Sequence, residues 1–268
     1  MFDLTGKVAL VTGAAGLLGS QFVEALLSHG AAVVAADIDE SALERLRLRE
    51  TIARQGERFQ GIAVDIIQPN SVADLFRDAV DRFGRIDVLI NNAAGKSADV
   101  RAFFTPFERY SLDIWREVMA VNLDAAFLCA QAAFNQFVSQ GGGGSIINIA
   151  SVYGVVASDN RIYEGSDYLG GPINNPAVYA ASKGGVVNFS RWLACYGAKH
   201  GIRSNAIAPG GVESGQNQIF VERYSNRVPL GRMARPHEMT GAVLYLASDA
   251  SSYMTGQTLV VDGGLTAW

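Results

Sequence analysis

Short runs of small and β-branched residues alternate with helical patterns along the whole chain. "KVALV" (7–11) and "AAVVAA" (31–36) are typical of strands buried on both faces, and the apolar residues between them are spaced for a helix. The alternation continues with strands at 61–65, 86–91, 145–150, 202–208 and 258–262, and with helices near 70–83, 111–138, 176–200 and 237–248. Strands joined by helical crossovers form a parallel sheet that is covered on both faces. The sequence therefore predicts a doubly wound α/β fold with a seven-stranded parallel sheet.

We expect a single domain over residues 1–268, because no linker, repeat or shift in composition divides the chain. The net charge is −4, and there is no basic patch of the kind that nucleic acid or an anionic membrane surface requires. Cys129 and Cys195 lie in helical apolar patterns, which suits reduced thiols in a cytoplasmic protein. No uninterrupted apolar run reaches membrane-spanning length, and three scattered histidines form no metal site. We therefore expect a cytoplasmic protein that acts on a small molecule, without nucleic acid, membrane or metal.

Glycines cluster in "TGAAGLLG" (12–19), where the first expected strand meets the first helix. Gly13, Gly16 and Gly19 would let the backbone turn tightly and approach a pyrophosphate, which the N–H groups at a helix N-terminus bind. The second strand ends at Asp37, and a carboxylate there accepts hydrogen bonds from the adenosine ribose and repels a 2′-phosphate. The next two residues offer no cation to bind that phosphate. The sequence therefore predicts a Rossmann-type site for NAD rather than NADP.

"YAASK" places Tyr179 and Lys183 four residues apart, on one face of a helix that Asn175 and Pro176 can start. A tyrosine, with an ordinary pKa of about 10, is a poor base at neutral pH. A neighbouring ammonium, a cationic nicotinamide and the helix N-terminus all favour the phenolate. Lowering the pKa by about three units needs roughly 4 kcal/mol. By spacing alone, the pair fits a surface tyrosine and a surface lysine equally well.

Six motifs follow one another along the chain: "TGAAGLLG", "NNAAG" (91–95), "AVNLDAAF" (120–127), "IINIAS" (146–151), "YAASK" (179–183) and "PGGVES" (209–214). In this order they resemble the short-chain dehydrogenase/reductase family, in its single-domain branch. The resemblance covers essentially the whole chain, including "ASDASSYMTGQTLVVDGG" (247–264). It implies an NAD(P)-dependent oxidoreductase that transfers a hydride between the nicotinamide and the carbon of a secondary alcohol.

The resemblance also implies a role for each matching residue. Tyr179 would be the general acid/base, and Ser151 would orient and polarise the substrate carbonyl or hydroxyl. Lys183 would lower the pKa of the tyrosine and bind the nicotinamide ribose, and Asn122 would hold a water in a proton relay.

The cofactor would contact a wider set of residues, with adenine at 65–66, the adenosine side at 92–95 and the carboxamide at 212–214. The full set is Gly13, Gly16, Leu17, Leu18, Gly19, Asp37, Asp65, Ile66, Asn92, Ala93, Gly95, Tyr179, Lys183, Pro209, Gly210, Val212 and Ser214.

One position departs from the family pattern, because the single-domain branch usually has its second glycine where this chain has Leu17. This spacing resembles the nucleotide-sugar branch, whose extra C-terminal substrate domain this chain is too short to hold. The departure bears on the geometry of the phosphate turn and not on the fold.

The segment "DNRIYEGSDYLGGPIN" (159–174) has neither a helical nor a strand period, and it forms an insertion at about 157–175 between Ser151 and Tyr179. A loop that leaves and re-enters at the carboxyl edge of a parallel sheet lies over the ligand crevice. We expect a glycine-hinged flap in which Tyr163 and Tyr168 stack on a sugar ring and Arg161 pairs with a phosphate or carboxylate. A mobile surface loop or a contact between subunits is the alternative.

The substrate is predicted more coarsely than the reaction. A sugar or sugar-derived substrate is our first expectation, because the insertion and the ending "VVDGGLTAW" resemble oxidoreductases of flagellin-modification and nonulosonic (legionaminic) acid pathways. A 3-oxoacyl-carrier-protein reductase or another ketone reductase is an alternative. A catalytically silent NAD-binding sensor is a second alternative, which the retained Ser151, Tyr179 and Lys183 argue against.

The resemblance also implies assembly of several copies. The helices expected near 111–138 and 176–200, with "SSYMTGQTLVVDGG" (251–264), resemble the surfaces through which this family forms tetramers. We therefore expect a homotetramer or a dimer.

Overall fold

The computed structural model describes residues 2–168 and 170–268. Its centre is a seven-stranded parallel sheet in the order β3-β2-β1-β4-β5-β8-β9. The strands are β1 (Val8–Thr12), β2 (Ala32–Asp37), β3 (Phe59–Ala63), β4 (Val88–Asn91), β5 (Gly144–Ile149), β8 (Ile202–Pro209) and β9 (Thr258–Val261). All seven expected strands are present within two residues of their expected ends, so the predicted sheet is confirmed.

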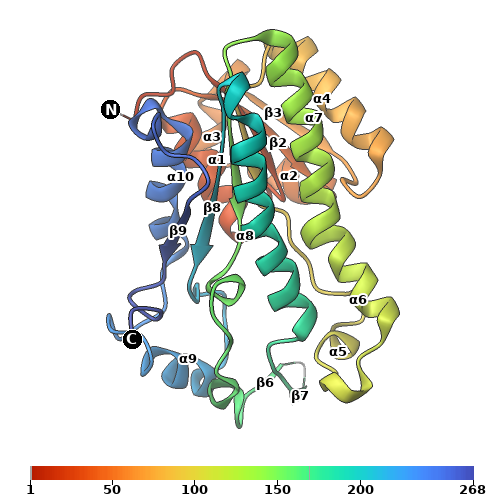
Figure 1. Cartoon of the computed structure of the whole chain (residues 1–268), viewed down its shortest axis with the longest axis vertical. Coiled ribbons are helices and arrows are strands. Elements are labelled where there is room, and N and C mark those ends of the chain that lie inside the picture. Colours follow the sequence, from red (N-terminus) through yellow and green to blue (C-terminus); the bar gives the residue numbers. More distant parts are fainter. Residues whose placement is uncertain (1, 169) are drawn as a thin grey trace.

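Strand order reverses beside β1, which pairs with β2 on one side and with β4 on the other. Val11 marks the register, since it lies opposite Ala35 of β2 and opposite Ile90 of β4. In open α/β sheets, ligands bind outside the carboxyl ends of the strands at such a reversal. The carboxyl ends of β8 and β9 point towards the lower end of the molecule in Figure 1, where α9 and the pair β6–β7 lie.

Helices cover both faces of the sheet, as predicted. The chain forms α1 (Leu17–Ser28), α2 (Glu40–Arg47), α3 (Glu50–Ala53), α4 (Pro69–Phe83), α5 (Val100–Phe103), α6 (Leu112–Met119), α7 (Ala125–Gln140), α8 (Ala177–Gly197), α9 (Gln218–Ser225) and α10 (Thr240–Ala247). Apolar residues of α1 and α10 form one core cluster with one face of the sheet, and those of α4, α7 and α8 form a second cluster on the other face. The sheet is therefore the middle of three layers (Figure 1).

The helix expected near 111–138 is interrupted once. α6 and α7 are joined by a π-helical turn, Ala120–Asp124, and π turns inside α-helices occur frequently at functional sites. By length and composition alone the run Leu112–Gln140 could cross a membrane, contrary to the expectation that no apolar run is long enough. Its inward side, with Cys129 and Phe137 fully buried, packs in the core beneath the sheet, as core helices of globular domains do.

The insertion is more regular than its sequence pattern predicted. Asn160–Tyr163 forms a 3-10 turn, and the short strands β6 (Asp167–Tyr168) and β7 (Gly171–Pro172) pair antiparallel. Figure 1 places this hairpin at the carboxyl edge of the sheet, between α9 and α5. The segment thus contains short regular elements although its sequence has no period, because cross-strand pairing over two residues is too short to leave one.

Candidate active site

The turn after β1 has the shape that a phosphate site requires. Gly13 has a φ of +60°, and a Cβ on Gly19 would overlap the carbonyl oxygen of Gly13, so both positions need glycine. Gly16 is the N-cap of α1, which begins at the exposed Leu17. The first N–H groups of an α-helix have no partner inside the helix, and here they belong to Leu17, Leu18 and Gly19. Leu17, where the chain departs from the usual spacing, is thus the first residue of the helix.

Asp37 connects the end of β2 to this turn. Its Oδ2 accepts a hydrogen bond from the Ala15 N–H at 2.9 Å, and its Oδ1 accepts one from the Asp39 N–H at 3.1 Å. Asp65 and Ile66 follow the neighbouring strand β3 and are half-buried. The three residues predicted for the adenosine end therefore lie at the carboxyl ends of adjacent strands, beside the turn that would hold the phosphates.

The segment after β4 is joined to the same turn. The Asn92 side-chain Nδ2 donates to the carbonyl oxygens of Thr12 and Gly13, both at 2.9 Å, and the Ala93 N–H donates to Thr12 Oγ1 at 3.1 Å. These bonds hold "NNAAG" against the phosphate turn at the reversal of strand order. The dinucleotide site that the sequence predicts is therefore assembled from the ends of β1, β2, β3 and β4.

Ser151, Tyr179 and Lys183 come together where β5 ends and α8 begins. α8 starts at Ala177, with Pro176 rather than Asn175 as its N-cap, so Tyr179 lies in the first turn. The Ser151 side chain lies beside the Tyr179 hydroxyl, close enough to lower its pKa. Lys183, only 3% exposed, donates from Nζ to the carbonyl oxygen of Ile149 at 2.8 Å, and this Nζ lies 6.0 Å from the centroid of the Tyr179 ring.

Asn122 joins this cluster to the segment after β4. It lies in the π turn and is 2% exposed. Its Oδ1 accepts a hydrogen bond from the Gly95 N–H at 2.9 Å, and its Nδ2 lies 3.4 Å from Ser182 Oγ, next to Lys183 on α8. The four predicted catalytic residues are therefore connected through the protein, although they come from three separate segments.

Burial decides the protonation of the cluster. It lowers the pKa of Lys183 from 10.5 to about 8, because an ammonium is costly to bury without a counter-ion. Burial also raises the pKa of Tyr179, and the hydrogen bond from Ser151 opposes that rise. In the protein alone Tyr179 is thus a neutral acid at pH 7, able to donate a proton.

No group of three or more metal-ligating side chains is found within residues 2–168 and 170–268.

The segment after β8 contains the remaining predicted cofactor residues, which are Pro209, Gly210, Val212 and Ser214. Gly210 donates from its N–H to the Val261 carbonyl oxygen at 2.9 Å, and Val212 forms an isolated bridge with Ala234. Ser214 is exposed, and its N–H donates to Gln216 Oε1 at 2.8 Å. The segment therefore passes from the sheet edge towards α9.

The three predicted substrate residues of the insertion have different surroundings. Arg161 forms a bidentate ion pair with Asp159, at 2.8 Å for each contact, and the Tyr163 ring packs 5.5 Å from that of Phe220 in α9. Tyr168 is 46% exposed and lies on β6. Of the three, Tyr168 presents the most freely exposed ring, and the other two side chains are engaged within the protein.

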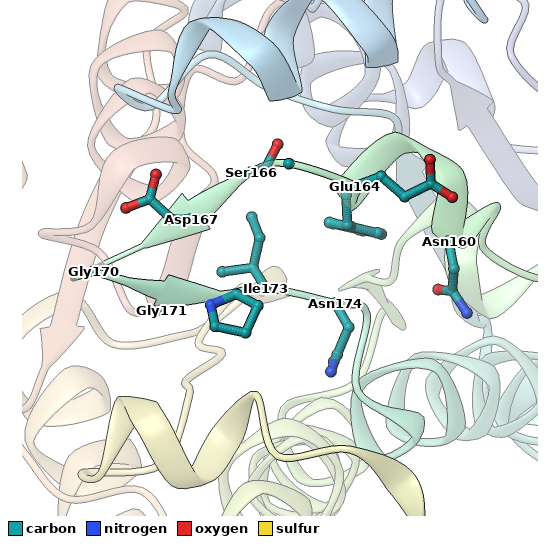
Figure 2. A pocket seen from close by; sticks show the side chains of 11 residues that line it. Asn160, Glu164, Ser166, Asp167, Gly170, Gly171, Ile173 and Asn174 are labelled. Carbon is teal, nitrogen blue, oxygen red and sulfur yellow. The ribbon is translucent and has the colours of Figure 1, made fainter.

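A hollow of about 640 Å³ is lined by residues of the insertion itself. Figure 2 shows Ile173 projecting into the space between the two arms of the insertion, with Glu164 and Asp167 at its rim. Ser151, Tyr179 and Lys183 do not line it. We therefore place the chemistry at the hydrogen-bonded cluster and not in this hollow.

Sequence reasoning missed three residues beside the cluster. A Cβ on Gly154 would lie 2.5 Å from the Lys183 carbonyl oxygen, so this glycine allows the turn after Ser151 to pack on α8. Tyr153, two residues after Ser151, hydrogen-bonds to Tyr163 through its hydroxyl. Lys96 follows "NNAAG" and lies over the Tyr168 ring. Their proximity in sequence to known motifs was the available signal, but their contacts depend on the tertiary fold.

Comparisons with known proteins agree with this geometry. The family described as "Enoyl-(Acyl carrier protein) reductase" matches residues 13–266. The "Short chain dehydrogenase/reductase astE" of Aspergillus oryzae is 35% identical, over 99% of this chain and 97% of its own. The "2-dehydro-3-deoxy-D-gluconate 5-dehydrogenase" of Escherichia coli K12 is 35% identical, over 99% of this chain and 98% of its own.

A solved structure is similar over the same extent. The crystal structure of a short chain dehydrogenase from Leptospira borgpetersenii with bound NAD+ superposes with a TM-score of 0.85 and 36% identity. It covers 98% of this chain and 94% of the other. The likeness therefore includes the sheet, both helical layers and the carboxyl edge where the residues above gather.

Proposed function

Since this chain belongs to the short-chain dehydrogenase/reductase family, we propose that it interconverts a secondary alcohol and a ketone on a sugar or sugar-derived substrate with NAD as cofactor. As a member of that family it is an oxidoreductase that acts on CH–OH groups. The observation that carries the proposal is the grouping of Ser151 and Tyr179 with the buried Lys183, whose Nζ lies 6.0 Å from the centroid of the Tyr179 ring. A protein that only bound a dinucleotide would not need these three groups together.

The residues of the cluster have separate tasks in this proposal. Ser151 holds the substrate oxygen by a hydrogen bond, and Tyr179 donates a proton to that oxygen in reduction and accepts it in oxidation. Lys183 places a positive charge near the Tyr179 ring, which stabilises the phenolate that forms when the proton leaves. The nicotinamide supplies or accepts the hydride. Asn122 keeps the Gly95 backbone and α8 in place around these groups.

The residues present fit a dinucleotide. Because Gly19 has no side chain, the turn can close tightly over the start of α1. The free N–H groups there can bind a diphosphate. Asp37 would accept hydrogen bonds from the adenosine ribose and repel a 2′-phosphate, which supports NAD over NADP. A relative in this family contains bound NAD+.

The sugar-derived substrate is supported by a relative and by the insertion. The Escherichia coli relative is named for a dehydrogenase of a keto-deoxy sugar acid. The exposed ring of Tyr168 at the carboxyl edge is suited to stack on a sugar. Membership of the subgroup of flagellin-modification and nonulosonic (legionaminic) acid pathways, and a role in carbohydrate metabolism, rest on the insertion and on the ending "VVDGGLTAW".

A second candidate is a reductase of an acyl group carried on a protein. One finding favours it, namely the description "Enoyl-(Acyl carrier protein) reductase" of the matching family. The expected cofactor preference opposes it, since an acyl-carrier reductase would usually favour NADPH, whose 2′-phosphate Asp37 would repel. The reductase candidate is therefore second to the sugar dehydrogenase.

We also propose that several copies assemble in the cytoplasm as a homotetramer or dimer. The rings of Trp192 and Tyr196 on α8 stack at 4.9 Å and are 57% and 53% exposed, and Phe127 on α7 is 46% exposed. Such a set of exposed aromatic residues on two neighbouring helices is typical of a surface between subunits.

The activity is tested with purified protein, NAD or NADP, and a panel of polyols, sugars, sugar acids and sugar phosphates. We expect NADH to form with at least one compound that bears a secondary alcohol, and to form faster than NADPH does. Turnover of acyl thioesters alone would favour the second candidate. NADH binding without turnover of any compound in either direction would favour the silent sensor.

A further inference from the structure

Lys96 lies between two aromatic rings at the carboxyl edge of the sheet. Its Nζ is 4.5 Å from the centroid of the Tyr168 ring and 5.5 Å from that of Phe104. The two rings meet edge to face, with centroids 6.3 Å apart. Tyr168 belongs to β6 of the insertion, and Phe104 follows α5. The ammonium is therefore held where the insertion meets the opposite wall of the site.

This position is close to the catalytic cluster. The residue before Lys96 is Gly95, whose N–H donates to Asn122 Oδ1 at 2.9 Å. Phe104 packs in the same apolar cluster as Tyr179. The carbonyl oxygen of Phe104 accepts a hydrogen bond at 2.9 Å from Asn174, just before α8 begins. Lys96 therefore follows a segment that is hydrogen-bonded to the cluster, and its ring partner Phe104 shares an apolar cluster with Tyr179.

The ammonium of Lys96 has no anionic partner. Over residues 2–168 and 170–268, no carboxylate forms an ion pair with it, and no side-chain or carbonyl oxygen accepts a hydrogen bond from it. Arg161, on the same insertion, by contrast forms an ion pair with Asp159, which also pairs with Arg227. Burial lowers the pKa of Lys96, which shows that part of its hydration is lost. Contacts with two rings recover some of that loss, but three N–H donors are left for a ligand.

A second hollow adjoins these rings. It has a volume of about 410 Å³ and is lined by Arg101, Phe104, Thr105, Pro106, Arg109, Tyr168 and Pro172. Among the described residues that line it are two arginines and no carboxylate, in a chain whose net charge is −4. The volume lies within the range of about 300–1,000 Å³ that is typical of small-molecule sites. The cationic side chains of Lys96 and Arg109 therefore lie at these rings, an arrangement that favours an anion.

We propose that Lys96 binds an anionic group, a carboxylate or a phosphate, at the end of the substrate remote from the reacting carbon. Tyr168 stacks on the carbon chain beside that group. The inference rests on the proposed oxidation of a sugar-like alcohol and narrows it to anionic sugar derivatives. Lys96 is then the residue that distinguishes a sugar acid or a sugar phosphate from the corresponding neutral polyol.

The test uses two variants and a matched control. Lys96→Met removes the charge but keeps an unbranched apolar side chain over the rings, whereas Lys96→Arg keeps the charge. Lys199→Met removes another lysine that lies over a ring, with Nζ 5.9 Å from the centroid of Tyr196 at the far end of α8. D-gluconate, D-glucitol 6-phosphate and D-glucitol provide a carboxylate, a phosphate and a neutral compound on similar carbon chains. KM, kcat and calorimetric binding are measured for each, together with the melting temperature.

We expect Lys96→Met to weaken the binding of the preferred anion about 10- to 100-fold, because a hydrogen bond to a charged group is lost. Its kcat at saturation and its KM for D-glucitol should stay within twofold, and Lys96→Arg should retain most of the affinity for the anion. Comparison of the affinities for D-gluconate and D-glucitol 6-phosphate then shows whether the site prefers a carboxylate or a phosphate. Lys199→Met should behave as the wild type.

Two results would overturn the inference. One is a wild-type enzyme that binds and turns over D-glucitol as well as it does either anion, which leaves the proposed function intact. The other is a Lys96→Met variant with a lowered melting temperature and equal losses for anionic and neutral compounds, since Lys96 would then only anchor the insertion. If the wild type oxidises none of the three compounds, calorimetry of the two anions alone decides the role of Lys96: weaker binding in Lys96→Met supports it, and unchanged or absent binding overturns it.

Discussion

Gly154 offers the sharpest test of how the catalytic cluster is held together. It lies in the 3-10 turn Val152–Gly154 that follows Ser151, and this turn packs directly on the backbone of α8. A Cβ at this position would lie 2.5 Å from the carbonyl oxygen of Lys183, 2.6 Å from its carbonyl carbon and 3.0 Å from the Gly184 nitrogen. All three are backbone atoms inside a helix, which cannot move aside as a flexible side chain can.

The magnitude of the effect follows from these distances. An ordinary contact between non-bonded heavy atoms is about 3.5 Å, so Gly154→Ala must move the turn and α8 apart by roughly 1 Å. Overpacking of this kind costs about 1–3 kcal/mol of the free energy of unfolding. Because Ser151 and Tyr179 lie on the two parts that separate, we expect kcat to fall about 10²-fold, which is typical of a 1 Å misplacement in an active site. The Kd for NADH should change less than kcat, since the phosphate turn is remote and only the expected contact of Lys183 with the nicotinamide ribose lies on the displaced helix.

The assay compares Gly154→Ala with Gly241→Ala by urea unfolding and by steady-state kinetics. Gly241 lies in α10, and a Cβ there would meet nothing within 4 Å. The control should therefore gain about 0.5–1 kcal/mol of stability, because alanine loses less backbone entropy than glycine, and it should keep its activity. A Gly154→Ala enzyme with wild-type stability and kcat would refute the view that this contact positions Ser151.

Four further predictions concern the site and the assembly. Tyr179→Phe should lower kcat about 10²- to 10⁴-fold with the Kd for NADH within twofold, and a variant that kept a tenth of the rate would show that another group moves the proton. Asp37→Ala should raise the KM for NAD and lower that for NADP, and a wild-type preference for NADP would contradict its role. Because the pKa of Lys183 falls from 10.5 to about 8 on folding, the unfolded chain holds more protons there between pH 8 and about 10, so the free energy of unfolding should rise with pH. Lys183→Met should flatten this rise in urea titrations, and an unchanged slope would assign it to another group. Trp192→Glu should shift the mass in light scattering towards the monomer, and a monomeric wild type at micromolar concentration would rule out the assembly.

The sheet could be predicted from the sequence because parallel strands buried on both faces are nearly continuous apolar runs. β1, with its pattern "VALVT" and all five residues buried, is such a strand. β3, at Phe59–Ala63, is an edge strand with partly exposed residues, and its predicted start was two residues too late. The start of α10 was predicted three residues too early, because the 3-10 turn at Pro236–Met239 precedes the helix and shares its apolar spacing.

The catalytic residues could be predicted from motifs, whereas their burial, their hydrogen bonds and their pKa values could not. The spacing of "YAASK" places Tyr179 and Lys183 on one helix face, but it does not show that Lys183 is buried and bound to the Ile149 carbonyl oxygen. That contact joins residues far apart in the chain, and the burial that lowers the pKa of the lysine likewise depends on the tertiary fold. Gly154 and Lys96 were missed for a similar reason, since their significance lies in what they touch in the fold.

The insertion shows most clearly how tertiary contacts change a prediction from sequence. A glycine-hinged flap would have few contacts with the rest of the protein. Here the Tyr163 ring packs on Phe220 of α9, and Asn217, at the N-cap of α9, donates to the carbonyl oxygen of Asp167 at 2.8 Å.

On its other side the insertion contacts the wall that contains α5, through the rings of Tyr168 and Phe104 and through the Asn174 hydrogen bond. The hairpin therefore connects α9 on one side of the insertion with the segment that contains α5 on the other. Any movement of α9 that opens the site must either carry the insertion with it or expose the buried residues Ile162 and Phe220 to water. Because exposing apolar side chains costs free energy, the insertion and α9 should move as one unit, with the glycines of the insertion forming its turns rather than its hinges.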